Sequence, residues 1–160
     1  MKKMFLPLVI IFTISTLSCK NAIKTVENNK DIARKFIEFW SAHDSVKVAS
    51  LYDEKFEYVD KGFIVKLSSK KDLISFVNGT AQGIPDFIFE PSKVVADENM
   101  AMIEWTWKGT FTVGFLPDYP GTNKPFTIQG VTVFEIKNGL ITRSTDYYDK
   151  ETFLKEVGLK

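Results

Sequence analysis

The sequence predicts an α+β fold in which helices pack against one face of a curved antiparallel sheet. Segments with helical periodicity come first along the chain, and long segments with strand alternation follow them. Asn138-Gly139 joins two of the alternating segments in the manner of a tight two-residue hairpin. Helices followed by strands are typical of the α+β class, and 160 residues fit a single domain.

Three helices are expected before the main sheet. The first begins at Asp31, and its apolar stripe consists of Ile32, Phe36, Phe39, Trp40 and His43. Asp44 is a suitable N-cap for a second, short helix. Ser69 is followed three residues later by Asp72, which resembles a capping box and predicts the start of a third helix.

The alternating segments predict the strands. Residues 55–67 alternate around Lys61-Gly62, which indicates a small hairpin, and Pro91 within 87–96 predicts an edge position or a bulge. The alternation is clearest over 100–113, whose expected inner face consists of Ala101, Ile103, Trp105, Trp107, Phe111 and Val113.

The last two strands are expected over 126–136 and 140–148, followed by a short helix over 150–158. Gly158 can end that helix because glycine accepts the left-handed conformation of a helix C-terminus.

Residues 1–18 predict a secretory signal peptide rather than part of the fold. They comprise a short basic start, an apolar run too short for a comfortable membrane span, and a small residue before the only cysteine, Cys19. "TLSC" resembles the bacterial lipobox, although Thr16 stands where leucine is preferred. We therefore expect residues 19–27 to be a lipidated cysteine and its polar tether, and residues 28–160 to be the folded domain. The alternative is a secreted chain in which Cys19 has no special role.

Charge and composition bear on the possible partners. The net charge is +1, and removal of Lys2 and Lys3 with the signal would take it to −1, without any basic run. No nucleic-acid partner is expected from such a chain. A single histidine and a single cysteine do not supply the usual metal ligand sets, so neither a metal nor a cofactor is expected.

Three stretches of the mature chain carry a family resemblance: "FIEFWSAHDSVKVASLYDEKFEYVD", "GIPDFIFE", and the stretch from "WTWKGT" to "KEVGL". In these stretches the chain resembles the SnoaL-like polyketide cyclase group of the nuclear transport factor 2-like superfamily. It implies a cone-like α+β barrel with an apolar pocket between sheet and helices. Relatives of this kind include cyclases, isomerases, hydrolases and domains that only bind or assemble, so the fold does not fix a reaction.

The candidate catalytic residues are Asp149 and Asp146. Alternation places Asp146 and Tyr148 on one face of the last strand and Tyr147 and Asp149 on the other, so the two carboxylates cannot form a pair in one pocket. Asp149 is either the N-cap of the last helix or, as the resemblance implies, the general base found near the end of the last strand in cyclases. Asp146 is either a pocket base or a surface-facing strand residue. The resemblance favours Asp149 slightly.

The candidate ligand-binding residues are aromatic, apart from the only histidine. His43 is either a boundary residue of the first helix or a pocket residue. The resemblance implies a histidine on the sheet as partner of the aspartate, and the expected sheet contains none. Tyrosines and Asp60 could donate hydrogen bonds to a ligand carbonyl, or simply suit a pleated surface. The full set is Trp40, His43, Tyr58, Trp105, Trp107, Tyr147 and Tyr148.

Three functions remain open on these grounds. The leading expectation is a lipid-anchored domain of the bacterial cell envelope, on the outer membrane or the periplasmic side, that binds a small, largely apolar molecule. The second is an enzyme in which Asp149 or Asp146 abstracts a proton and Tyr58 or His43 acts as the acid. The third is an assembly module that forms a homodimer through the exposed face of the sheet.

Overall fold

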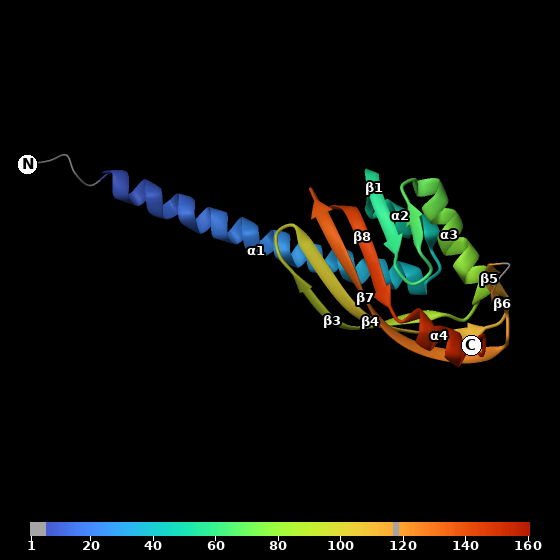
Figure 1. Ribbon diagram of the computed structural model, residues 1–160. Helices are drawn as coiled ribbons and strands as arrows, with labels where there is room; N and C mark the ends of the chain where they lie inside the picture. The colour runs from blue at the N-terminus through green and yellow to red at the C-terminus, as the bar shows by residue number, and fades with distance from the viewer. Residues whose placement is uncertain (1–5, 117–118) are drawn as a thin grey trace, which may run out of the picture.

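The computed structural model describes residues 6–116 and 119–160, with side chains from residue 22 onward except 115–118 (Figure 1). The elements are α1 (Leu6–Ser41), α2 (Ser45–Ser50), β1 (Tyr52–Asp60), β2 (Val65–Leu67), α3 (Lys70–Gly83), β3 (Ile88–Ala96), β4 (Met100–Phe111), β5 (Gly114–Leu116), β6 (Tyr119–Pro120), β7 (Lys124–Lys137), β8 (Leu140–Tyr148) and α4 (Lys150–Glu156). The predicted α+β class is confirmed.

Six strands form one curved sheet in the order β2-β1-β8-β7-β4-β3 (Figure 1). All neighbours are antiparallel except β1 and β8, which run parallel and differ in this respect from the antiparallel sheet that was predicted. β3 lies at an edge, and its register shifts between Pro91 and Lys93, as the proline predicted. The parallel contact brings the first strand beside the last, although about ninety residues of sequence separate them.

The N-terminal part of α1 projects away from the sheet, and its C-terminal part packs against it (Figure 1). α1 begins at Leu6 rather than at the predicted Asp31, so residues 19–27, the expected tether, have helical backbone. The first buried side chain among those described is Asn29, whose amide donates to the Asp97 carbonyl at 2.9 Å. In the described residues, no helix is both long enough and apolar enough to cross a membrane.

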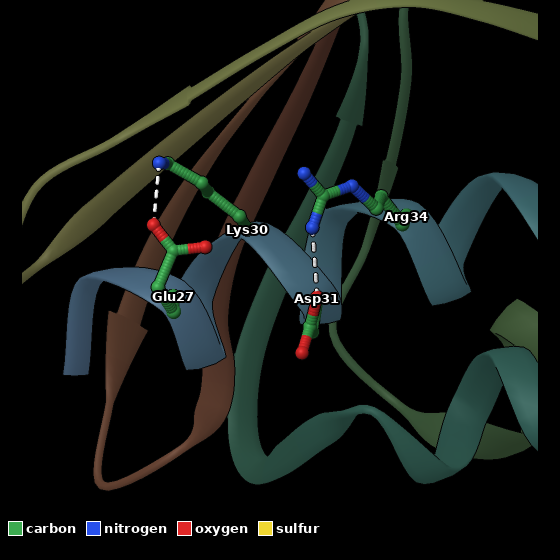
Figure 2. Close-up of polar contacts among 4 residues, drawn as sticks. All are labelled: Glu27, Lys30, Asp31 and Arg34. Atoms are coloured by element: carbon green, nitrogen blue, oxygen red, sulfur yellow. Dashed lines mark hydrogen bonds and ion pairs between the residues drawn. The ribbon is translucent and has the colours of Figure 1, made fainter. Parts of the chain in front are cut away.

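Burial of one face holds α1 on the sheet. Glu27–Lys30 and Asp31–Arg34 form ion pairs at 2.7 and 2.8 Å on the solvent side (Figure 2). Exposed pairs of this kind contribute at most about 1 kcal/mol each. The opposite face buries Ile32, Ala33, Phe36, Ile37 and Trp40, and fully burying one large apolar side chain contributes roughly 1.5–3 kcal/mol.

Local sequence signals set the ends of the other helices as predicted. Asp44 caps α2 by accepting from the Lys47 amide, and Ser69 caps α3 by accepting from the Asp72 amide. Gly158 has φ +73° after α4, and its amide donates to the Lys155 carbonyl.

The structure places two residues, His43 and Val113, differently from the prediction. α1 ends at Ser41, so His43 lies in the turn before α2, with φ 55°, and not on the stripe of the helix. β4 ends at Phe111, and Val113 is 63% exposed instead of facing the core. In both cases the apolar pattern continues past the point where the backbone turns.

Candidate functional site

A cavity of about 270 Å³ lies between the inner face of the sheet and the helices α1 and α3. Its walls are mostly aromatic and aliphatic, with a small number of polar groups. The helices contribute Phe36, Ile37, Trp40, Ser75, Phe76, Gly79 and Thr80; the sheet and the β1–β2 turn contribute Tyr58, Asp60, Phe63, Val65, Phe89, Trp105, Trp107, Thr132, Asp146 and Tyr148. This composition is typical of a small-molecule site.

Asp146 on β8 is the best-positioned carboxylate of the cavity. It is directly opposite Thr132 of β7, whose hydroxyl donates to its Oδ1 at 2.6 Å. The hydroxyl of Tyr58 on β1 donates to its Oδ2 at 2.7 Å. Thr132 in turn accepts from Nε1 of Trp105 at 2.9 Å, so the carboxylate belongs to a hydrogen-bonded chain that crosses four strands.

This environment shifts the pKa of Asp146. Its pKa is raised from 3.8 to about 7, chiefly by burial and also by the negative charge of Asp60, while the hydrogen bonds from Thr132 and Tyr58 act in the opposite direction. A carboxyl group with a pKa near neutrality can both accept and release a proton at physiological pH.

A second carboxylate, Asp60 on β1, faces the same cavity. It pairs with Asp146 in the parallel register of β1 and β8. The hydroxyl of Tyr148 donates to its two oxygens at 3.0 and 2.8 Å, and the amide of Phe63 donates to Oδ1 at 2.9 Å. Burial raises the pKa of Asp60, against the lowering effect of these hydrogen bonds.

The shape of the aromatic wall depends on Gly130 of β7. Gly130 lies opposite Trp105 on one side and Tyr148 on the other. A Cβ at this position would lie 2.2 Å from the Trp105 ring, so only glycine leaves space for the indole. Trp105 and Tyr148 then approach with ring centroids 6.1 Å apart.

The structure separates the two aspartates in the way that strand alternation predicted. Asp149 is exposed, caps α4 by accepting from the Glu151 amide at 2.9 Å, and does not line the cavity. The hydroxyl of Thr152 also donates to it at 2.6 Å, and this bond lowers its pKa. The N-cap interpretation of Asp149 is therefore confirmed. The slight preference for Asp149 as the pocket carboxylate is wrong, because Asp146 occupies that position.

The cavity brings together five of the seven predicted ligand-binding residues, namely Trp40, Tyr58, Trp105, Trp107 and Tyr148. Two do not line it. His43 contacts the Phe87 carbonyl through Nε2 at 3.0 Å, and its ring packs on Phe87. Tyr147 is 46% exposed on the opposite face of β8. The side chain of Cys19 lies outside the described residues.

Sequence reasoning did not select Thr132, and it considered Asp60 only as a hydrogen-bond donor to a ligand and not as a partner of Asp146. Asp60 ends a short alternating segment, and only the parallel contact with β8 brings it beside Asp146. Threonine is common in strands, so Thr132 carries no signal of a site role until its partner across the sheet is known. Phe36, Phe76 and Phe89 fit a core equally well, so no local signal distinguishes them from packing residues. In the described residues, no group of three His, Cys, Asp or Glu is placed to hold a metal ion.

Comparison with solved structures supports a fold of the ketosteroid isomerase and SnoaL type. A protein with a ketosteroid isomerase-like fold from Catenulispora acidiphila, solved with trimethylamine, is 19% identical with a TM-score of 0.71, and the match covers 81% of this chain and 93% of that one. A proposed SnoaL-like polyketide cyclase from Jannaschia sp. CCS1 is 12% identical with a TM-score of 0.75, covering 84% and 94%. At these identities the likeness shows the fold alone.

A third similar structure is AclR from Streptomyces galilaeus, a proposed hydroxylase. It is 16% identical with a TM-score of 0.72, and the match covers 84% of this chain and 83% of that one. Proteins named for different reactions therefore share this architecture.

No curated protein matches the sequence. The model of the family described as SnoaL-like polyketide cyclase matches residues 30–157, which is most of the chain. The matched segment includes every residue that lines the cavity. This chain belongs to the SnoaL-like polyketide cyclase family.

Proposed function

We propose that this chain binds a small, largely apolar molecule in the cavity between α1, α3 and the sheet. The observation that supports this most directly is the cavity of about 270 Å³, with aromatic walls and a few convergent polar groups. Small-molecule sites are commonly clefts of roughly 300–1,000 Å³, so this one suits a compact ligand.

A thermal-shift screen of compact apolar molecules tests the proposal. A ligand at about 100 times its Kd stabilises the native state by about 2.7 kcal/mol, which raises Tm by roughly 5–10 °C for a chain of this size. Gly79 on α3 offers a matched pair of variants, because it lines the cavity and a Cβ added there meets no atom within 4 Å. Gly79→Phe should abolish the shift by filling the space, and Gly79→Ala should retain it. Equal shifts in both variants would locate binding elsewhere.

A second candidate function is proton transfer by Asp146. It is favoured by the pKa of about 7 and by the Tyr58 hydroxyl at 2.7 Å, which holds the carboxylate in a fixed orientation. In such a reaction the carboxylate takes a proton from a carbon next to a carbonyl group, and the enolate then recovers a proton at another carbon. Thr132 and Tyr58 hold Asp146 in place, whereas the family resemblance implied a histidine of the sheet as the acid–base partner of the aspartate.

Isomerisation of a β,γ-unsaturated cyclic ketone, followed by ultraviolet absorbance, tests this second candidate. The rate should rise with pH through the pKa of Asp146 and fall by about 10²–10⁴-fold in Asp146→Asn. Asp149→Asn should leave it unchanged. Equal rates in Asp146→Asn and the parent chain would exclude Asp146 as the base.

We further propose that the domain is anchored to the cell envelope through a lipid on Cys19. The support is the basic and apolar start of the chain and the "TLSC" sequence. Incorporation of an alkyne-tagged palmitate in cells should occur in the parent chain and be lost in Cys19→Ser. Labelling that persists in the variant would rule out this site.

Homodimerisation through the outer face of the sheet is a fourth proposal. Tyr147 is 46% exposed on that face, where an aromatic side chain could be covered by a second copy. Light scattering should give twice the monomer mass for the parent chain and the monomer mass for Tyr147→Lys. A monomer at high concentration for both proteins would contradict the proposal.

A further inference from the structure

The described side chains that line the cavity are unbalanced in charge. Two of them, Asp60 and Asp146, are carboxylates, and none is a lysine, arginine or histidine. The hydrogen bonds that the two carboxylates accept from the described residues come from neutral donors, including the hydroxyls of Tyr58, Thr132 and Tyr148 and the Phe63 amide. Any negative charge that forms there therefore has no cationic side chain inside the cavity to neutralise it.

A basic group outside the lining, Lys150, acts on Asp60. Lys150 begins α4, and its charge lowers the pKa of Asp60. Its Nζ lies 5.8 Å from the centre of the Phe63 ring, and it is not among the residues that line the cavity. No ion pair joins either cavity carboxylate to a basic side chain in the part of the chain that the structure describes.

The rest of the wall is rich in aromatic rings. Trp107 and Phe89 are stacked with an interplanar angle of 9° and centroids 5.7 Å apart. Trp40 meets Phe89 edge-on at 6.0 Å, and it meets Phe76 edge-on at 6.1 Å. The face of an aromatic ring carries negative partial charge, and it attracts an organic cation within about 6 Å of its centre.

We propose that the ligand of this cavity is a compact organic ammonium ion, with its apolar substituents against the aromatic wall and its positive charge facing Asp60 and Asp146. This inference rests on the proposed binding function and names the chemical class of the ligand. Carboxylates in a cavity lined by aromatic rings attract a cation, whereas they disfavour an anionic ligand of the same size.

Binding of such a cation is coupled to the protonation of the carboxylates. The ammonium favours ionised Asp146, so binding releases a proton when that group starts protonated. The affinity for a quaternary ammonium, whose own charge does not depend on pH, should therefore increase as the pH rises toward the pKa of Asp146 and level off above it. Asp60, whose pKa is also raised by burial, shares this dependence. Tyr58 and Tyr148, which donate to Asp146 and Asp60, stay neutral over this range because burial raises their pKa values, and the positive charge of Lys150 acts against binding.

Choline and 3,3-dimethylbutan-1-ol provide a matched pair of probes, because they differ in replacement of the ammonium nitrogen by a neutral carbon. Binding of each is measured by calorimetry at pH 8 on the full chain, in a non-ionic detergent that contains no choline group. We expect choline to bind at least about tenfold tighter. The preference should shrink in Asp60→Asn and in Asp146→Asn and persist in Asp149→Asn, the exposed control. Circular dichroism and Tm confirm that each variant is folded.

The outcomes separate this inference from the proposed function. Equal or tighter binding of the neutral alcohol would overturn the ammonium assignment and leave the apolar binding function standing. Binding of neither probe, together with an empty thermal-shift screen, would overturn both. An undiminished preference for choline in folded Asp60→Asn and Asp146→Asn would show that the carboxylates do not select the cation. The parent-chain comparison of the two probes decides the question even if one variant does not fold.

Discussion

The two ends of one short segment, Asp146 and Asp149, carry the same side chain in opposite environments. Asp146 is buried in the cavity, and its pKa is raised to about 7, chiefly by loss of water. Asp149 lies at the surface three residues later, and its pKa is lowered, chiefly by the hydrogen bond from the Thr152 hydroxyl. The difference teaches that the side of the strand, and not the residue type, decides whether a carboxylate here can take part in proton transfer or only caps a helix.

The largest expected effect is a difference in how stability depends on pH. The folded chain binds the Asp146 proton more tightly than the unfolded chain, so the stabilising contribution is complete below the ordinary pKa of 3.8 and is lost as the pH rises toward about 7. The difference between the two pKa values corresponds to a loss on the order of 4 kcal/mol. Asp60 acts in the same direction, because its pKa is also raised.

Urea unfolding at several pH values measures this loss of stability. Asp146→Asn cannot ionise, so more than half of the loss of stability between about pH 4 and pH 8 should disappear. Asp149→Asn should keep that loss, because the lowered pKa of Asp149 contributes stability above its ordinary pKa and loses it only as the pH falls. A full pH-dependent loss in Asp146→Asn would assign the effect to other groups.

The hydroxyls of Thr132 and Thr152, which donate to Asp146 and Asp149, offer a second comparison. Thr132→Val keeps the shape of the side chain but leaves Nε1 of Trp105 without its acceptor and Oδ1 of Asp146 without a donor. Removing a partner from a buried polar group costs about 1–3 kcal/mol, and the pKa of Asp146 should rise further. Thr152→Val at the surface should have a smaller effect on stability and raise the pKa of Asp149. Chemical denaturation and carboxyl NMR titration measure both, and equal losses of stability would contradict the comparison.

The two tyrosines between the aspartates test the alternation of β8 directly. The Tyr148 hydroxyl donates to Asp60 at 2.8 Å, so Tyr148→Phe should cost roughly 1 kcal/mol and raise the pKa of Asp60. Tyr147 is 46% exposed, so Tyr147→Phe should change the free energy of unfolding by less than about 0.5 kcal/mol. A larger effect at Tyr147 than at Tyr148 would show that the inner face has been misassigned.

The last comparison concerns the N-cap of α4 at the surface. Asp149→Ala removes the cap of α4 and should lower Tm by roughly 2–4 °C, while Asp149→Asn, which can still accept from the helix amides, should recover most of that loss. Thermal unfolding followed by circular dichroism measures both. Loss of ligand binding in Asp149→Ala without a change in Tm would contradict a purely structural role.

Most of the local structure could be predicted from the sequence, because its signals act over a few residues. Caps at Asp44, Ser69 and Asp149, the hairpin at Asn138-Gly139 and the edge position of Pro91 each follow from the conformation that one residue type favours. The predictions for His43 and Val113 are wrong because apolar spacing continues where the backbone has already turned.

The sequence by itself determined that Asp146 and Asp149 lie on opposite faces, because successive side chains of a strand alternate. Only the tertiary structure decided which face is the cavity, and that Asp60, Thr132 and Tyr58 surround Asp146. These contacts arise from strand pairing, in one case between residues 88 apart in sequence, and local periodicity carries no information about which strands become neighbours. The pKa of Asp146 follows from that pairing, since desolvation depends on everything that closes over the carboxylate and not on the residues beside it in the chain.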